Sequence, residues 1–292
     1  MTRWMLAAGL ALTLSAGAAH AQPPAAIFTD PPADAAHPAR AETLHIPTGG
    51  PTGGVKVNGL AYIAAGPGAH PTVILFHGMP GIEKNLDLAQ AIRRAGWNVV
   101  TLNYRGSWGS PGTYSFKGNL ADAKAVLAYV RTPEVAAKLQ IDTSRLVVAG
   151  HSMGGWVTAM TAATDPDLKG AVMISAADME QVGRLPMAQR VTLAADSMES
   201  LAGVTAESMA ADMGSLGGLG FAAAAPGLTG RPLLILSSDD GLAGMTDALA
   251  ADIRKRGGQK VATVHGATNH AWDSLRVRLY SEVITWLDAL PK

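Results

Sequence analysis

The sequence predicts an α/β fold: a doubly wound, mostly parallel sheet with a short helical lid insertion. Three observations predict this class. Short apolar runs alternate with segments of helical periodicity, several of the runs end in glycine, and one long segment interrupts the alternation. A continuous apolar run such as Thr72–Gly78 is typical of a strand buried on both faces. The regular pattern begins near residue 42, so we treat 42–292 as one domain.

The individual elements follow from the same periodicities. Strands are expected at Leu44–Thr48, Val55–Ala64, Thr72–Gly78, Asn98–Gly106, Arg145–Gly150, Gly170–Ala177, Arg231–Asp240 and Lys260–Ala267. Helices are expected at Leu86–Gly96, Asn119–Leu139, Ser152–Ala163, Leu242–Gly257 and Ser274–Leu290. The pair Asn58-Gly59 is a turn signal and is expected to split the second strand.

The segment Asp178–Leu228 breaks the alternation. It lies between two predicted strands and carries five of the 12 methionines (Met179, Met187, Met198, Met209 and Met213). Apolar residues at helical spacing, interrupted by glycines, predict a few short helices over the carboxyl edge of the sheet. Methionine suits an adaptable apolar pocket, which favours a lid or cap. A helical embellishment with methionine as core filler is the alternative.

The first residues have the features of a secretory signal. Thr2 and Arg3 precede the apolar stretch Trp4–Ala18, and Ala19-His20-Ala21 has the small-x-small form of a cleavage site. We expect Met1–Ala21 to be removed, leaving a periplasmic or secreted protein without stable membrane insertion; an uncleaved anchor is the alternative. Residues 22–41, rich in proline and alanine, are expected to be a flexible lead-in.

Composition excludes several function classes. The 23 basic residues balance the 23 acidic ones, which gives no electrostatic reason to expect a nucleic-acid partner. The chain has no cysteine, so cysteine nucleophiles, iron–sulfur clusters and thiolate zinc sites are excluded. Composition leaves the oligomeric state open.

The motif G-x-S-x-G occurs once, at Gly150-His151-Ser152-Met153-Gly154, directly after a predicted strand and before a predicted helix. Glycines at a tight strand-to-helix turn let the two elements approach closely, and they leave the Ser152 hydroxyl outside the sheet. We therefore interpret Ser152 as a nucleophile. An ordinary strand-to-helix connection that contains a serine is the alternative.

A serine nucleophile needs a base and an orienting acid, in the chain order Ser, acid, His for this architecture. After the strand that contains Leu233–Leu236 come Asp239 and Asp240, and Asp240 is preferred because the acid must lie beyond the strand to reach across. His270 is preferred as the base over His265, which falls within or at the end of a strand. Asp239 stays the alternative acid.

The oxyanion of an acyl-transfer intermediate needs two donors. The Met153 amide directly follows the nucleophile. The loop His77–Gly81 supplies the second donor; because Pro80 has no N–H, the Met79 amide is the candidate. A simple Gly/Pro turn is the alternative. His77 and His151 are expected to shape their own loops.

These stretches together resemble the α/β-hydrolase superfamily over about Val55 to Leu290, through "HGMPG", "NYRGSWGSPG", "GHSMGG", "SSDDGLAG" and "TNHAWD". "NYRGS" with Ser-x-Gly-Gly is similar to prolyl-oligopeptidase-type catalytic domains and to dienelactone-hydrolase-like esterases. No propeller is expected ahead of this domain, and "SSDD" lacks the glycine that many relatives carry before the acid. The resemblance implies two-step acyl transfer without a metal or organic cofactor.

Three functions follow as expectations. The first is an exported serine hydrolase that cleaves small carboxylic esters. The second is a small prolyl-oligopeptidase-like peptidase or amidase, and the third is a noncatalytic binding protein that keeps the fold. A peptidase that binds a substrate amine needs paired acids. Glu83 is the only acid near the oxyanion loop and has no obvious partner, which favours esters.

Overall fold

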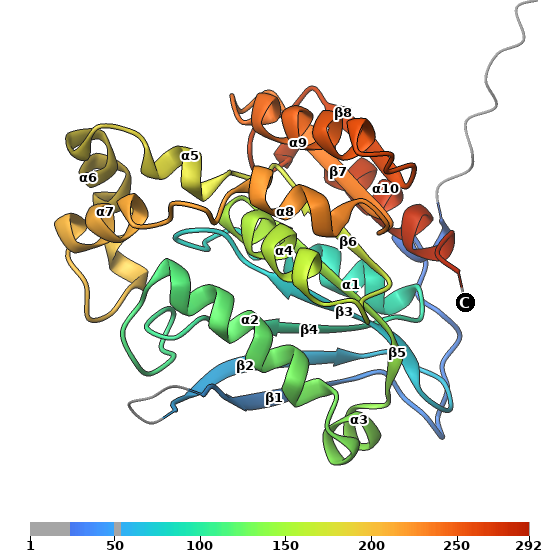
Figure 1. Ribbon diagram of the computed structural model, residues 1–292. Coiled ribbons are helices and arrows are strands. Elements are labelled where there is room, and N and C mark those ends of the chain that lie inside the picture. Colours follow the sequence, from blue (N-terminus) through green and yellow to red (C-terminus); the bar gives the residue numbers. More distant parts are fainter. Residues whose placement is uncertain (1–23, 50–53, 292) are drawn as a thin grey trace, which may run out of the picture.

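The computed structural model describes residues 24–49 and 54–291, and in them eight strands form one sheet in the order β1-β2-β4-β3-β5-β6-β7-β8 (Figure 1). The strands are β1 (Arg40–Pro47), β2 (Lys56–Ile63), β3 (His70–Phe76), β4 (Asn98–Leu102), β5 (Ile141–His151), β6 (Gly170–Ile174), β7 (Leu233–Ser238) and β8 (Val261–Gly266). β2 pairs antiparallel with β1 and β4, and every other pair is parallel. The predicted mostly parallel sheet is confirmed.

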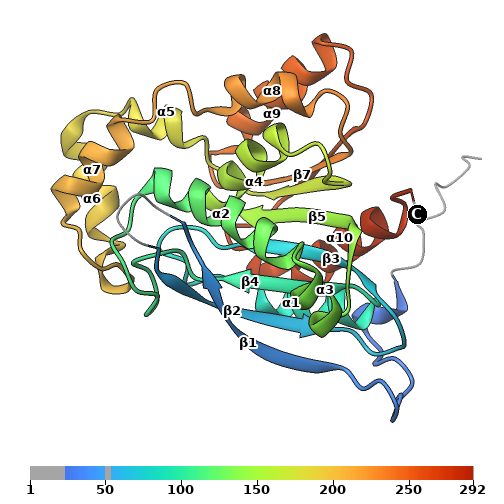
Figure 2. The same ribbon diagram turned by 60° about the horizontal axis from the view of Figure 1, so that its bottom comes forward.

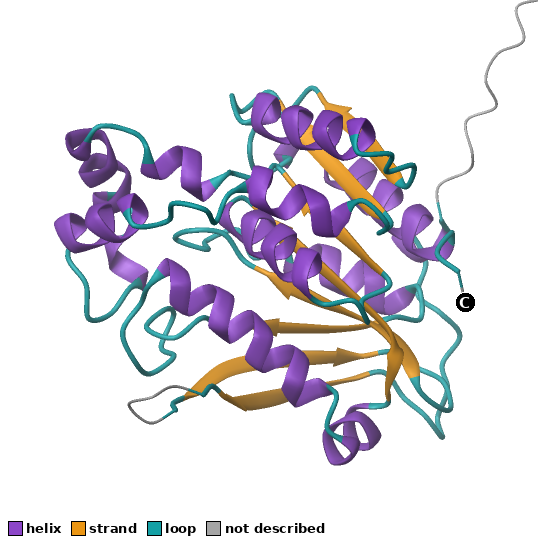
Figure 3. Cartoon of the chain, viewed as in Figure 1, coloured by secondary structure: helices purple, strands orange, loops and turns teal. Residues whose placement is uncertain are grey.

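Helices cover both faces of this sheet (Figure 3). α1 (Leu86–Arg94) and α10 (Arg276–Asp288) pack on one face; α2 (Phe116–Val130), α3 (Pro133–Leu139), α4 (Met153–Thr164), α8 (Phe221–Leu228) and α9 (Ala243–Lys255) lie on the other side. Alternate strand residues divide between the two cores: Ile74 and Phe76 face one, Val73 and Leu75 the other. Burial on both faces explains why the sequence of β3 is a nearly continuous apolar run.

The expectation of a turn at Asn58-Gly59 is wrong. β2 runs unbroken through these residues and pairs with β1 from Arg40↔Ile63 to Pro47↔Lys56. A β-carbon on Gly59 would lie 2.7 Å from the Thr101 carbonyl oxygen, so the glycine permits close approach of neighbouring strands rather than a turn.

Short helices fill the segment between β6 and β7, as predicted. They are α5 (Met179–Gly183), α6 (Met187–Ala195), the 3₁₀ helix Met198–Ser200, α7 (Ala206–Gly214) and α8. α6 and α7 project beyond one end of the sheet (Figure 2). Met179, Met209 and Met213 are buried in the core, so these methionines act as packing groups. A bridge between Ser107 and Leu201 joins this segment to the loop after β4.

The predicted signal Met1–Ala21 lies outside the described residues. Within the predicted lead-in, residues Ala25–Ile27 form a 3₁₀ helix; Ile27 is buried, and the Arg94 guanidinium donates to the Ala26 carbonyl at 2.7 Å. Part of this segment therefore packs on α1. No helix in the described ranges has both the length and the hydropathy to cross a membrane.

Candidate active site

Ser152 occupies the turn between β5 and α4 with φ 58° and ψ −123°. Positive φ is unfavourable for a residue with a β-carbon and is tolerated only where surrounding contacts hold it. Here the Ser152 amide donates to the Ile174 carbonyl at 2.9 Å, and its carbonyl accepts from the Gly155 and Ala177 amides at 2.9 and 3.1 Å. The strained turn leaves the Ser152 side chain partly exposed, as the motif predicted.

The glycines around the turn allow three backbone segments to meet. A β-carbon on Gly150 would press on the Gly154 carbonyl, and one on Gly154 would press on the Phe76 carbonyl. On Gly78, a β-carbon would lie 2.9 Å from Ser152 Cβ and 3.5 Å from Ser152 Oγ. The loop after β3 therefore lies directly against the serine turn.

His270 and Asp240 meet at the carboxyl edge of the sheet. His270 Nδ1 lies 2.7 Å from Asp240 Oδ2, and the Leu242 amide donates to Asp240 Oδ1 at 2.9 Å. The Asp240 side chain is 4% exposed, whereas the His270 side chain is 40% exposed. Burial by itself would raise the pKa of Asp240, but the hydrogen bonds from His270 and Leu242 and the attraction of His270 hold it below its ordinary value. The carboxylate is therefore ionised at neutral pH, and His270 Nε2 points away from it.

His151 connects the turn of Ser152 with the loop of His270, a contact that the sequence motif did not predict. Among the described residues, the Ser152 hydroxyl makes no hydrogen bond, and contacts between a serine and a neighbouring imidazole in such sites often tighten only when a substrate binds. His151 Nε2 donates to the His270 carbonyl at 2.9 Å, and the two rings lie 4.6 Å apart. His151 therefore connects the loop of His270 to the turn that carries Ser152.

The buried state of His151 fixes its protonation. Burial, and then the charge of neighbouring His270, lower the pKa of His151 to about 4. Its ring is therefore neutral at pH 7, with the proton on the nitrogen that faces the His270 carbonyl. We expected His151 only to shape the turn, because side-chain direction at that position does not follow from the motif.

The two rejected candidates, Asp239 and His265, pair with each other. His265 Nε2 lies 2.9 Å from Asp239 Oδ1, and His265 Nδ1 lies 3.0 Å from Ser237 Oγ. Asp239 thus faces a different imidazole, and Asp240 is the aspartate that contacts His270. Ser237 lies within β7, where it aligns with His265 of the neighbouring β8.

The Met79 amide is positioned by His77. His77 Nδ1 donates to the Gly78 carbonyl at 2.7 Å, and burial lowers the pKa of His77 to about 4. Because a trans peptide is planar, fixing the Gly78 carbonyl on one side directs the Met79 N–H to the other. In the described loops no hydrogen bond uses this amide. The Met153 amide opens α4 and has no partner inside its helix.

Trp108 holds the same loop from outside, and sequence reasoning missed it. Its indole Nε1 donates to the Pro80 carbonyl at 2.6 Å, and the Ser200 hydroxyl donates to the same oxygen at 3.2 Å. Trp108 adopts φ 47°, and the Lys84 ammonium lies 4.3 Å above its ring centre. Positive φ is rare for a bulky residue and therefore marks Trp108 as a constrained position, but a backbone angle is visible only in the structure.

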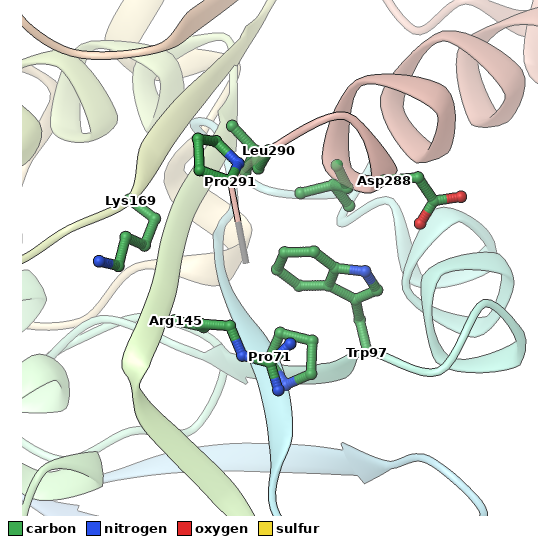
Figure 4. Close-up of a pocket in the computed structure, with 8 residues that line it drawn as sticks. Pro71, Trp97, Arg145, Lys169, Asp288, Leu290 and Pro291 are labelled. Atoms are coloured by element: carbon green, nitrogen blue, oxygen red, sulfur yellow. The ribbon is translucent and has the colours of Figure 1, made fainter.

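A pocket of about 100 Å³ lies at the other edge of the sheet (Figure 4). Pro71 and Lys169, beside the starts of β3 and β6, line it together with Trp97 and Asp288. Ser152, Asp240 and His270 do not line it, so it is separate from the candidate active site.

Among the described residues, no group of three or more His, Asp or Glu side chains is arranged to hold a metal ion.

Comparison with known proteins identifies the class. The family model for the alpha/beta hydrolase fold matches residues 71–216, half of the chain, and the chain belongs to this family. The alpha/beta hydrolase domain-containing protein WAV2 of Arabidopsis thaliana is 35% identical over 106 residues, which cover 36% of this chain and 33% of WAV2. The chain spans about a third of the length of the curated relatives it matches.

Two solved structures have the same fold. The thermostable carboxylesterase EstE1, cloned from a metagenomic library, is 20% identical with a TM-score of 0.64, covering 92% of this chain and 93% of its own. The acylaminoacyl peptidase of Pyrococcus horikoshii is 15% identical with a TM-score of 0.59, covering 85% of this chain and 41% of its own. At these identities the likeness establishes the fold alone.

Proposed function

We propose that this protein is a serine hydrolase that cleaves carboxylic esters of modest size through an acyl-enzyme. One contact supports this activity most directly: His270 Nδ1 lies 2.7 Å from the buried carboxylate of Asp240, beside the strained turn that carries Ser152. The order Ser, Asp, His at three strand ends supports it further, as does membership of the α/β-hydrolase family.

The chemistry proceeds in two acyl transfers. Ser152 Oγ attacks the ester carbonyl carbon while His270 Nε2 accepts the hydroxyl proton, and the Met79 and Met153 amides hold the oxyanion. The bond to the alcohol oxygen then breaks, and His270 protonates that oxygen. A water molecule, deprotonated by His270, attacks the acyl carbon and releases the acid. Asp240 stays ionised and stabilises the imidazolium.

The surroundings of Glu83 favour esters over peptides with a free amino terminus. The Glu83 carboxylate accepts from the Asn85 amide and lies 3.9 Å from the Arg276 guanidinium. It is therefore already engaged and has a cation beside it, so it is poorly suited to bind a substrate ammonium. The fold shared with acylaminoacyl peptidase keeps peptide or amide cleavage as the second candidate.

Rates on paired substrates test the proposal. Purified protein is assayed with p-nitrophenyl esters of increasing acyl length and with peptide p-nitroanilides, and Ser152→Ala is the control. We expect a higher kcat/KM on short esters, and no turnover by Ser152→Ala. A higher kcat/KM on anilides would favour the peptidase. Absence of turnover on both, with ligand binding unchanged in Ser152→Ala, would favour a noncatalytic binding protein.

Export and a lid are further parts of the proposal. The features of Met1–Ala21 support removal of a signal before Gln22, which amino-terminal sequencing of the protein from the periplasm or medium tests. The helices of Asp178–Leu228 lie next to the loop after β4 through the Ser107–Leu201 bridge, which supports a lid beside the oxyanion loop.

A further inference from the structure

The guanidinium of Arg276, the first residue of α10, lies between the loop of His270 and the start of α1. Its Nη1 donates to the Ala271 carbonyl at 2.8 Å, and Ala271 directly follows His270. The same nitrogen donates to Asn85 Oδ1 at 3.0 Å, and Nε donates to Asp87 Oδ2 at 2.9 Å. One side chain therefore connects two segments that are far apart in the sequence.

The partner of Arg276 at the start of α1 is a buried asparagine. Asn85 stands at the N-cap position of α1, where an asparagine side chain usually accepts from a helix amide. It makes no such bond here, and its Oδ1 accepts from Arg276 instead. Asn85 is 1% exposed and adopts φ 55°, a conformation that asparagine tolerates better than most residues. The local sequence thus gives up a helix cap for this contact.

Arginine suits this position because its planar fork donates in several directions at once. The side chain is only 16% exposed, and a cation with so little solvent needs carboxylate partners. Asp87 accepts from two of its nitrogens, and Glu83 lies 3.9 Å away. Burial by itself would lower the pKa of Arg276, but the hydrogen bonds to Asp87 and the attraction of both carboxylates hold it above its ordinary value. The guanidinium is therefore a permanent, balanced cation.

We propose that Arg276 is a positioning residue that anchors the loop of His270 to the start of α1 and so keeps the imidazole in place for proton transfer. This inference rests on the proposed function of His270 as the base. Arg276 acts through the Ala271 carbonyl and not on a substrate. His151 holds the preceding carbonyl, that of His270, so two consecutive carbonyls of this loop are anchored.

Hydrogen exchange tests the anchor without relying on catalysis. In Arg276→Ala, the peptide that contains Ala271 should exchange about tenfold faster than in the wild type, because a hydrogen bond from a charged group is lost. Arg278→Ala is the matched control: Arg278 lies on the same helix, and its guanidinium pairs with Glu282 at 3.4 Å. Equal exchange of this peptide in the two variants would overturn the inference. If Arg276→Ala does not fold, Arg276→Lys, which keeps the charge and loses the fork, should give an intermediate rate.

Ester hydrolysis separates positioning from a purely structural role. Arg276→Ala should lower kcat about tenfold and leave KM within about twofold of wild type, because a displaced base slows the reaction more than it weakens binding. Millimolar guanidinium chloride should restore part of this kcat, whereas sodium chloride should not. An unchanged kcat, a loss that Arg278→Ala shares, or equal effects of the two salts would overturn the inference.

Labelling of Ser152 by a fluorophosphonate shows whether Arg276 acts through the base. Once His270→Gln has removed the imidazole, Arg276→Ala should slow labelling little further, and full additivity would overturn the inference. Wild-type protein that stays unlabelled would instead contradict the proposed hydrolase, and exchange of the Ala271 peptide would still decide whether Arg276 anchors the loop. The two failures are therefore distinguishable.

Discussion

The Nδ1 atom of His270 lies 2.7 Å from the Oδ2 atom of Asp240, across 30 residues of sequence. The neighbouring Asp239 instead lies 2.9 Å from His265 Nε2. Two adjacent carboxylates thus serve two different imidazoles. One pair is at the serine turn and the other is on the exposed side of β8, so their loss should have different consequences.

Replacement of Asp240 by Asn should reduce kcat on esters by about 10³- to 10⁴-fold, because the amide no longer holds the imidazole in the productive tautomer or stabilises its charged form. Asp239→Asn is the matched control and should keep kcat within about twofold of wild type, because the exposed Asp239 carboxylate faces His265 and not His270. Ester hydrolysis under saturating substrate measures both. The reverse ranking would make Asp239 the acid.

Gly78→Ala should lower kcat by about 100-fold while the protein still folds, because a small displacement of catalytic groups has an effect of this size. The new methyl would lie 2.9 Å from Ser152 Cβ, so either the serine or the oxyanion loop must move. Gly217→Ala is the control, since a β-carbon there meets no atom within 4 Å. Equal kcat for the two variants would contradict close contact between this loop and Ser152.

Trp108→Phe should lower kcat about fivefold, the effect expected from one lost neutral hydrogen bond. The phenyl ring cannot donate to the Pro80 carbonyl, so the loop that carries the Met79 amide is held less firmly. Ser200→Ala removes the longer bond to the same oxygen and should have a smaller effect. Steady-state kinetics of the two single variants and the double variant provide the measurement; an unchanged double variant would refute this role of Trp108.

Unfolding stability should fall as the pH drops from about 6.5 toward 4. Burial lowers the pKa of both His77 and His151 to about 4, whereas the unfolded chain binds these protons near pH 6.5. Between these values the unfolded state takes up more protons, so acid favours unfolding, by about 2–3 kcal/mol for each buried ring at pH 4.

Urea unfolding at pH 7 and pH 4.5 measures this loss. His151→Gln removes one titrating ring and keeps a side-chain amide N–H for the His270 carbonyl, so about half of the pH dependence should disappear. A stability that does not change between the two pH values would show that neither ring is held neutral.

The sequence predicted features that depend on local backbone requirements. The G-x-S-x-G turn follows from the steric needs of a strand that passes directly into a helix, and the structure has that turn at Ser152. The alternation of apolar strands and amphipathic helices predicted the layered fold. Asp240 and His270 were found because strand ends of a parallel sheet share one edge.

Features that depend on contacts distant in sequence were not predicted. Asn58-Gly59 has the local signature of a turn, but the close approach of Thr101 places the glycine inside a strand. The pairing of Asp239 with His265 depends on the register between β7 and β8, where Ser237 aligns with His265. The contacts of His151 and Trp108 depend on side-chain direction across loops, which periodicity does not contain.

Reaction with a fluorophosphonate tests the central claim most directly, because this reagent phosphonylates a serine only where a base and oxyanion donors activate it. Peptide mapping by mass spectrometry should find the adduct on Ser152 in the wild type, no adduct on that peptide in Ser152→Ala, and much slower labelling in His270→Gln. Full-length protein that stays unlabelled at Ser152, or labelling at the same rate without the His270 imidazole, would contradict a serine nucleophile activated by His270 and Asp240.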